Sequence, residues 1–156
     1  PIKINYIISD TKGAKGLKLA KLYKIPFRIL NLSKLISLES VSRELHKKNI
    51  SLICLAGYMK ILNKQFINKF KKKIINIHPS LLPKYKGLNT FKRVLKNKEK
   101  LTGCTIHYVN NKLDSGKIIL KKRVFIESND TEETLKTKVQ AKEHCAYSES
   151  IINIFR

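Results

Sequence analysis

The stretch Lys71–Gly87, KKKIINIHPSLLPKYKG, joins an apolar strand to a polar ending. Residues Ile74–Ile77 are typical of a short buried strand. Pro79 stops this strand directly after His78, because proline lacks the N–H that a sheet requires. Alternate side chains of a strand face the same way, so Asn76 and His78 are predicted to point together. The sequence therefore places an amide beside an imidazole at a strand end, before a loop marked by proline and glycine.

Strand and helix patterns alternate outward from this stretch. Strands are predicted at residues 2–9, 26–30, 51–57, 74–77, 104–109 and 117–125. Helices are predicted at 14–23, around 38–45, through 66–70, at 90–97, and from about 130 to near the end, with Asp130 as the N-cap of the last. The alternation predicts a single α/β domain over residues 1–156, an open, mostly parallel Rossmann-like sheet with flanking helices in three layers.

The composition is strongly basic, with a formal net charge of +22 over 156 residues. Lysine far outnumbers arginine and is spread along the chain, which favours a solvated basic surface over a nucleic-acid groove. A nucleic-acid-binding module stays an alternative. No apolar run approaches the roughly 20 residues that span a bilayer, and no signal peptide is visible, so a cytoplasmic protein without a membrane partner is expected. Cys54 and Cys104 are expected in the core, and Cys145 is not expected to be a nucleophile.

The Asn76 and His78 side chains suit acyl chemistry. An amide can donate a hydrogen bond to an oxygen that becomes negative in a tetrahedral intermediate. An imidazole, whose ordinary pKa is near ~6.5, can move a proton between two nitrogens. Asp114 lies in a predicted loop, where its carboxylate could orient His78 and stabilise the imidazolium. The simpler alternative is that all three satisfy a strand end and a turn, and His107 is expected to be an ordinary sheet histidine.

The last predicted helix carries a carboxylate on its apolar side. Leu135, Val139 and Ala146 define an apolar stripe, and Glu143 falls within that stripe. A buried carboxylate is costly unless it is paired or used. With Gln140 one turn earlier, Glu143 could hold a polar substrate through its amine. A buried salt bridge to a lysine is the alternative.

Four segments together resemble the folate-dependent phosphoribosylglycinamide formyltransferase family of purine synthesis. They are CLAGYMKIL (54–62), INIHPSLLPKYKGLNTF (75–91), GCTIHYVNNKLDSGKIIL (103–120) and VQAKEHCAY (139–147). The HPSLLP loop alone fits several folate-dependent formyltransferases and deformylases. The QxxEH pattern that begins at Gln140, combined with PKYKGLNT, favours the glycinamide ribonucleotide branch.

The resemblance implies the formyltransferase fold and transfer of a formyl group from 10-formyltetrahydrofolate to the amine of glycinamide ribonucleotide, without a metal. It implies small-molecule substrates and a monomer or homodimer. Another folate-dependent formyltransferase, a formyltetrahydrofolate hydrolase and a non-catalytic basic module are the alternatives. Lys60 stands where the family usually has arginine. The implied catalytic residues are Asn76, His78 and Asp114; the implied folate contacts are Met59, Lys60, Ile61, Leu62, Asn76, Asn110, Asn111, Lys112, Leu113 and Asp114; the implied substrate contacts are Gln140 and Glu143.

The resemblance does not include the strand and glycine-rich phosphate loop with which the family begins, nor its final strand and tail. The strand at 2–9 resembles the family's second strand. We therefore expect either a fragment truncated at both ends or a reduced relative. The segment DTKGAKG (10–16) could cradle a phosphate at a helix N-terminus, but an ordinary turn is the preferred interpretation.

Overall fold

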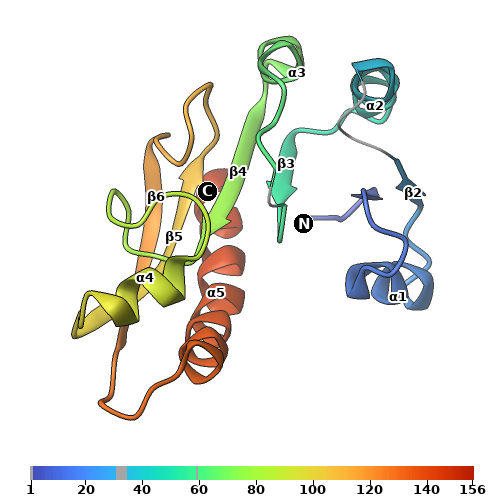
Figure 1. The fold of residues 1–156 in the computed structure, drawn as a ribbon. Helices are drawn as coiled ribbons and strands as arrows, with labels where there is room; N and C mark the ends of the chain where they lie inside the picture. The colour runs from blue at the N-terminus through green and yellow to red at the C-terminus, as the bar shows by residue number, and fades with distance from the viewer. Residues whose placement is uncertain (1, 31–34, 59) are drawn as a thin grey trace. The chain divides into compact units, whose positions relative to one another are not determined.

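The computed structural model describes residues 2–30, 35–58 and 60–156. The chain forms two compact units, whose helices and strands are labelled in Figure 1. The first unit comprises Pro1–Ser51 and Asn68–Phe70, and the second comprises Leu52–Ile67 and Lys71–Arg156. That the whole chain is one domain stays a prediction.

The first unit contains a small parallel sheet. Its strands are β1 (Ile7–Ser9) and β2 (Phe27–Ile29), joined by helix α1 (Lys15–Leu22). Helix α2 (Leu35–Lys47) buries its predicted stripe of Leu38, Val41 and Leu45. Strand β1 is shorter than the predicted strand at 2–9, because residues 2–6 do not join the ladder with β2.

The second unit is built on a four-stranded mixed sheet. Its strands are β3 (Leu52–Leu55), β4 (Lys73–His78), β5 (Leu101–Tyr108) and β6 (Ile118–Phe125), in the order β3-β4-β5-β6. Strands β3 and β4 are parallel, whereas β5 and β6 are antiparallel to their neighbours. The β5–β6 connection contains no helix, so the chain can only return antiparallel. The predicted α/β fold is confirmed, with this antiparallel hairpin at one side.

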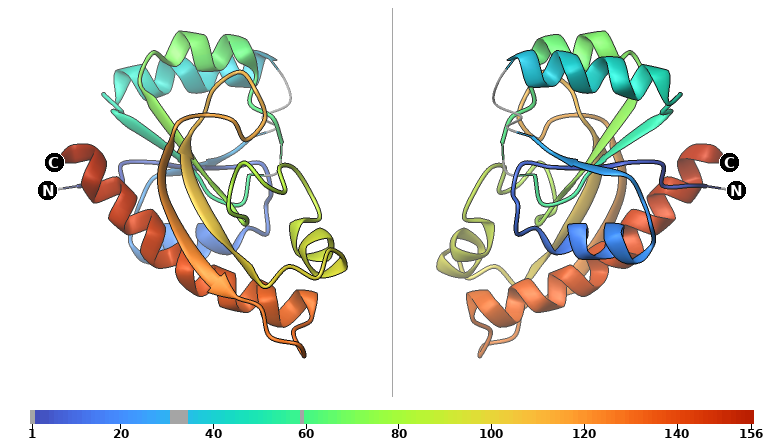
Figure 2. Two further views of the ribbon diagram at one scale, coloured as in Figure 1. Left: turned by 90° about the vertical axis from the view of Figure 1, so that its left-hand side faces the viewer. Right: turned by 90° about the vertical axis from the view of Figure 1, so that its right-hand side faces the viewer.

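Three helices complete the chain. They are α3 (Lys64–Phe70), α4 (Thr90–Lys96) and α5 (Glu132–Phe155). The long α5 lies along the β5–β6 hairpin and also contacts α4 (Figure 2). None of the described helices combines the length and apolar character needed to cross a membrane.

The N-cap of α5 is Thr131, so the prediction of Asp130 was wrong. The Thr131 hydroxyl accepts a hydrogen bond from the Thr134 N–H at 3.2 Å, and the Thr134 hydroxyl accepts one from the Thr131 N–H at 2.9 Å. This reciprocal capping box satisfies two N–H groups of the first turn. The Asp130 carboxylate instead accepts the Glu127 N–H and pairs with Lys138. It therefore fixes the loop that leads into the helix.

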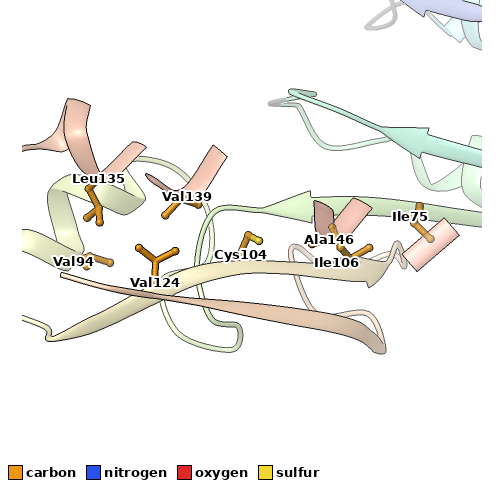
Figure 3. Packing of buried hydrophobic residues seen from close by; sticks show 8 residues of the cluster. All are labelled: Ile75, Val94, Cys104, Ile106, Val124, Leu135, Val139 and Ala146. Atoms are coloured by element: carbon orange, nitrogen blue, oxygen red, sulfur yellow. The ribbon is translucent and has the colours of Figure 1, made fainter. Parts of the chain in front are cut away.

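The core of the second unit lies between α5, α4 and the sheet (Figure 3). Cys104 is buried there as predicted, and the predicted stripe on α5 is confirmed. Cys54 and Cys145 are exposed, so the expectation that Cys54 is a core residue was wrong; its strand, β3, is an edge strand of the four-stranded sheet. The eight residues of the core cluster are Ile75, Val94, Cys104, Ile106, Val124, Leu135, Val139 and Ala146.

Gly103 permits a close approach between β5 and β6, and Gly103→Ala should destabilise the protein. A Cβ atom added at Gly103 would lie 1.9 Å from the Lys122 carbonyl oxygen, and the φ angle there is +157°. Relieving this contact must move a backbone, which is expected to cost about 3 kcal/mol or more. Gly16, in α1, has no atom within 4 Å of an added Cβ, so Gly16→Ala is the control and should not destabilise. Urea unfolding of both variants tests this expectation, and equal stabilities would contradict it.

Candidate functional site

His78 ends β4 and is almost fully buried, with 5 % of its surface exposed. Its Nδ1 lies 3.3 Å from Asp114 Oδ2, and its Nε2 lies 2.8 Å from the Tyr85 carbonyl oxygen. A carboxylate and a carbonyl can only accept hydrogen bonds. An imidazole that donates to both must carry two protons, so this geometry suits the charged form of His78. A neutral ring can keep only one of the two contacts.

Asp114 reaches His78 from the loop between β5 and β6. Its backbone is left-handed, with φ +43°, which turns the side chain back toward the end of β4. Asp114 Oδ2 also accepts the Gly87 N–H at 2.9 Å. Gly87 has φ +79°, which glycine adopts without strain. The carboxylate thus ties the β5–β6 loop to the loop that follows β4.

Asn76 faces His107 across the β4–β5 pair. The two residues are partners in the ladder, and Asn76 Nδ2 lies 3.4 Å from His107 Nε2. His107 Nδ1 lies 2.9 Å from the Tyr108 carbonyl oxygen and must donate to it, so Nε2 is free of a proton and accepts from the amide. Burial lowers the pKa of His107, which favours this neutral form. His107 Nε2 is also 3.7 Å from Asp114 Oδ1.

Sequence reasoning missed this role of His107. It is hydrogen-bonded within the sheet, as expected of an ordinary sheet histidine, but it also orients the amide of Asn76. The only signal that could have shown this contact is the pairing register of β4 with β5, which a single sequence does not reveal.

Thr105 fixes the loop after His78. Its hydroxyl donates to the Ser80 carbonyl at 2.6 Å and accepts the Leu82 N–H at 3.1 Å. The Ser80 hydroxyl donates to the Lys84 carbonyl at 2.6 Å. A buried hydroxyl that both donates and accepts holds the loop against β5. The Pro-marked loop predicted from the sequence is therefore a rigid support for His78.

The structure brings three of the predicted residues into one cluster. Asn76 and His78 share a face of β4, opposite His107 and Thr105 of β5, and Asp114 contacts both histidines. Their roles in catalysis are taken up below as proposals.

The predicted folate contacts lie on two segments. Met59 is outside the described residues. Lys60 and Ile61 are exposed, whereas Leu62 is buried. The predicted contacts 110–113 are exposed and form a turn in which Asn110 Oδ1 accepts the Lys112 N–H at 2.9 Å.

Gln140 is exposed on α5, and Glu143 is half-buried. Burial raises the pKa of the Glu143 carboxyl group. Across the described ranges, Glu143 has no hydrogen bond or salt bridge, so the alternative of a buried salt bridge to lysine finds no support there. Neither residue contacts the His78 cluster through a hydrogen bond within the part of the chain that the structure describes.

In residues 2–30, 35–58 and 60–156, no group of three or more His, Cys, Asp or Glu side chains is arranged to hold a metal ion. The expectation of metal-free chemistry stays a prediction.

Residues 2–151 match the family described as formyl transferase. The chain belongs to the formyl transferase family. It is 39% identical to phosphoribosylglycinamide formyltransferase of Haemophilus influenzae, an alignment that covers 94% of this chain and 71% of that protein. It is also 39% identical to the trifunctional purine biosynthetic protein adenosine-3 of Chironomus tentans, covering 96% of this chain but 11% of that protein. The chain thus spans a small part of its trifunctional relatives.

Solved structures of phosphoribosylglycinamide formyltransferases have the same fold as this chain. The phosphoribosylglycinamide formyltransferase of Bacillus halodurans superposes with a TM-score of 0.91 at 37% identity, covering 99% of this chain and 81% of that one. The enzyme of Anaplasma phagocytophilum gives a TM-score of 0.90 at 40% identity, covering 96% and 72%. The predicted formyltransferase fold and the predicted resemblance to this branch of formyl transferases are confirmed.

The neutral state of His107 makes the stability of this formyl transferase depend on pH. Burial holds the pKa of His107 below its ordinary value of 6.5. At pH values between the folded pKa and 6.5, the unfolded chain therefore binds a proton at His107 while the folded chain does not. The stability from neutral His107 is present above pH 6.5 and is lost as the pH falls toward the folded pKa. Between pH 7.5 and 5.5, wild type should lose up to about 1 kcal/mol more free energy of unfolding than His107→Gln does.

Urea unfolding of both proteins at the two pH values measures this difference. Each protein is compared with itself, so a general effect of the substitution cancels. Equal losses would show that His107 is not held neutral by the fold.

Proposed function

We propose that this chain transfers a formyl group from 10-formyltetrahydrofolate to the amine of glycinamide ribonucleotide. The observation that carries the proposal is the buried His78–Asp114 pair on the same strand face as Asn76, in a member of the formyl transferase family. The similarity to named phosphoribosylglycinamide formyltransferases supports the choice of acceptor.

Three side chains have the chemistry that the transfer needs. A new C–N bond forms between the substrate amine and the formyl carbon, and the bond from that carbon to the folate nitrogen breaks. Asn76 donates one amide N–H to His107 and has a second with which to stabilise the formyl oxygen as it becomes negative. His78 takes the proton from the attacking amine and delivers it to the leaving nitrogen of tetrahydrofolate.

Asp114 and Tyr85 support the charged state that His78 passes through. When His78 is neutral and keeps its Nδ1 proton on Asp114, the lone pair of Nε2 and the Tyr85 carbonyl oxygen repel each other, so this contact opens and Nε2 can accept the amine proton. Once protonated, Nε2 can donate to the Tyr85 carbonyl, at the 2.8 Å distance that the structure has, until the leaving nitrogen takes the proton. The proposed cycle alternates between these two hydrogen-bond states.

The substrates are assigned to the flanking segments by the family resemblance. Segments 59–62 and 110–114 are proposed to bind the folate, with Asn76 beside its formyl group. Gln140 and Glu143 are proposed to bind glycinamide ribonucleotide. A half-buried carboxylate without a cationic partner suits a substrate amine. We further propose that the chain acts in the cytoplasm as one catalytic domain, as a monomer or homodimer, on these small molecules.

An assay of formyl transfer tests the proposal directly. The chain and a version extended at its N-terminus with a relative's first strand and glycine-rich loop are each incubated with both substrates. Mass spectrometry then measures formylated glycinamide ribonucleotide and free formate. Formylated product from either protein supports the proposal. Formate alone would indicate a hydrolase, and no turnover by either protein would overturn the proposal.

His78→Ala should abolish transfer, with a turnover rate lowered by roughly 10²-fold or more, because the substitution removes the proton carrier. Folate affinity should change little, since the imidazole acts in the transition state. The control is His46→Ala, which removes an exposed histidine of α2. Turnover and folate binding, the latter by fluorescence titration, are measured for both. An unchanged turnover rate in His78→Ala would remove His78 from the mechanism.

Glu143→Gln should raise the KM for glycinamide ribonucleotide by roughly 10-fold or more, because a hydrogen bond to a charged group is lost. The KM for the folate should not change. Glu133→Gln makes the same replacement at an exposed position of the same helix and serves as the control. Steady-state kinetics with each substrate varied in turn distinguish the two. A rise in the folate KM alone would assign Glu143 to the other substrate.

A further inference from the structure

Tyr85 reaches His78 with its backbone and reaches α4 and the segment after it with its side chain. Its carbonyl oxygen lies 2.8 Å from His78 Nε2, and its hydroxyl donates to Glu99 Oε1 at 2.8 Å. We propose that Glu99 is a positioning residue, which acts through the Tyr85 side chain to hold the carbonyl that accepts a hydrogen bond from Nε2–H of charged His78. The functional part of this inference rests on the proposed formyl transfer.

The backbone of Tyr85 needs to be held in place. Its φ angle is +57°, in the left-handed region that side chains other than glycine and asparagine seldom adopt. Such a conformation is strained and persists only where the surroundings impose it. If the residue relaxed to a negative φ, the peptide plane would rotate and the carbonyl would turn away from His78 Nε2.

Three contacts hold the Tyr85 side chain. Besides the bond to Glu99, Asn97 Nδ2 donates to the Tyr85 hydroxyl at 2.9 Å. The Arg93 guanidinium lies 5.4 Å from the centre of the ring, within the range of a cation–π interaction. Arg93 also donates to the Lys86 carbonyl at 2.6 Å, which ties the same loop to α4. All three partners belong to α4 or to the segment directly after it.

Glu99 is suited to act as the acceptor in this group. The hydrogen bond from Tyr85, followed by that from Lys84, holds the pKa of Glu99 below its ordinary value. The carboxylate therefore stays ionised at neutral pH and cannot compete as a donor. Its bond to Lys84, at 3.2 Å, joins it to a side chain that is 69 % exposed, so the bond to Tyr85 is the better protected of the two.

Glu99 lies 21 residues from His78 in the sequence and has no contact with it among the described residues. The link runs from Glu99 to the Tyr85 ring, along one backbone unit, and on to His78 Nε2. Weakening the Tyr85–Glu99 hydrogen bond should therefore weaken the hydrogen bond between the Tyr85 carbonyl and His78 Nε2. No group that is proposed to touch a substrate is removed.

The NMR signal of the His78 Nε2–H tests the inference without an activity assay. In wild type at a pH where His78 is charged, ¹H–¹⁵N NMR should show a solvent-protected Nε2–H signal, assigned by its absence in His78→Asn. Tyr85→Phe and Glu99→Ala should lose the protected signal. Glu99→Gln should keep it, because the amide oxygen still accepts from the hydroxyl. Lys84→Ala, which removes only the exposed ion pair, should also keep it.

Kinetics supply the second readout. Tyr85→Phe and Glu99→Ala should each lower kcat on the order of tenfold, with KM values within about twofold. The double variant should show no further loss, because both changes break the same bond. Melting temperatures identify any variant that fails to fold. If Glu99→Ala fails to fold, Glu99→Gln is the decisive variant, and its kcat should be close to that of wild type.

A wild-type Nε2–H signal and kcat in Glu99→Ala would overturn the inference, as would additive losses in the double variant. Absence of transfer by wild type would overturn the proposed function instead, and the NMR comparison would still decide whether Glu99 positions His78.

Discussion

The pairing of β4 with β5 in one register is the constraint on which the site depends. Asn76 lies opposite His107, and His78 lies opposite Thr105, while Ile77 lies opposite Ile106. The polar residues occupy one face, and the core residues that pack against α5 occupy the other. A slip of one residue would exchange the two faces, burying the amide and the imidazole in the core and losing every contact of the cluster. The burial that stabilises the sheet therefore also selects the geometry of the site.

Two loops then complete what the sheet begins. The loop after β4 is fixed by Thr105 and returns a carbonyl to His78, and the loop after β5 returns Asp114. In each loop the residue that contacts His78, Tyr85 or Asp114, has a left-handed backbone conformation. A buried polar network is stable only when each member has a partner, since unpaired polar groups are costly in a low dielectric. The two loops bring one hydrogen-bond acceptor to each ring nitrogen of His78, and both contacts can be made only when the ring is doubly protonated.

The sequence was sufficient to predict the features that depend on local period. The two-residue repeat of a strand placed Asn76 and His78 together, and the helical repeat placed Glu143 within the apolar stripe of α5. It was not sufficient where contacts join distant segments. The partnership of Asn76 with His107 depends on register, and the turn of Tyr85 toward His78 depends on a backbone conformation that tyrosine does not encode.

The N-cap of α5 shows the same limit at short range. Asp130 and Thr131 both have side chains that cap helices, and neighbouring candidates differ only in which backbone N–H their oxygens reach. Thr134 decides between them, because its hydroxyl can complete a reciprocal pair with Thr131. The residue types predict that a helix begins near Asp130. The hydrogen bonds between Thr131 and Thr134 determine that its N-cap is Thr131.

The excess of basic residues makes the lack of a salt bridge at half-buried Glu143 informative. The chain has 33 lysine and arginine residues for 11 aspartate and glutamate residues. Most of the acidic side chains pair with a cation or a histidine, as Glu44 does with Arg28 and Glu149 with Lys122. With so many lysine and arginine side chains in the chain, a carboxylate with no other role would be expected to form an ion pair with one of them. Glu143 is half-buried, with a raised pKa and no such bond in the described part of the chain. The cost of that arrangement is understandable if a ligand amine supplies the missing charge.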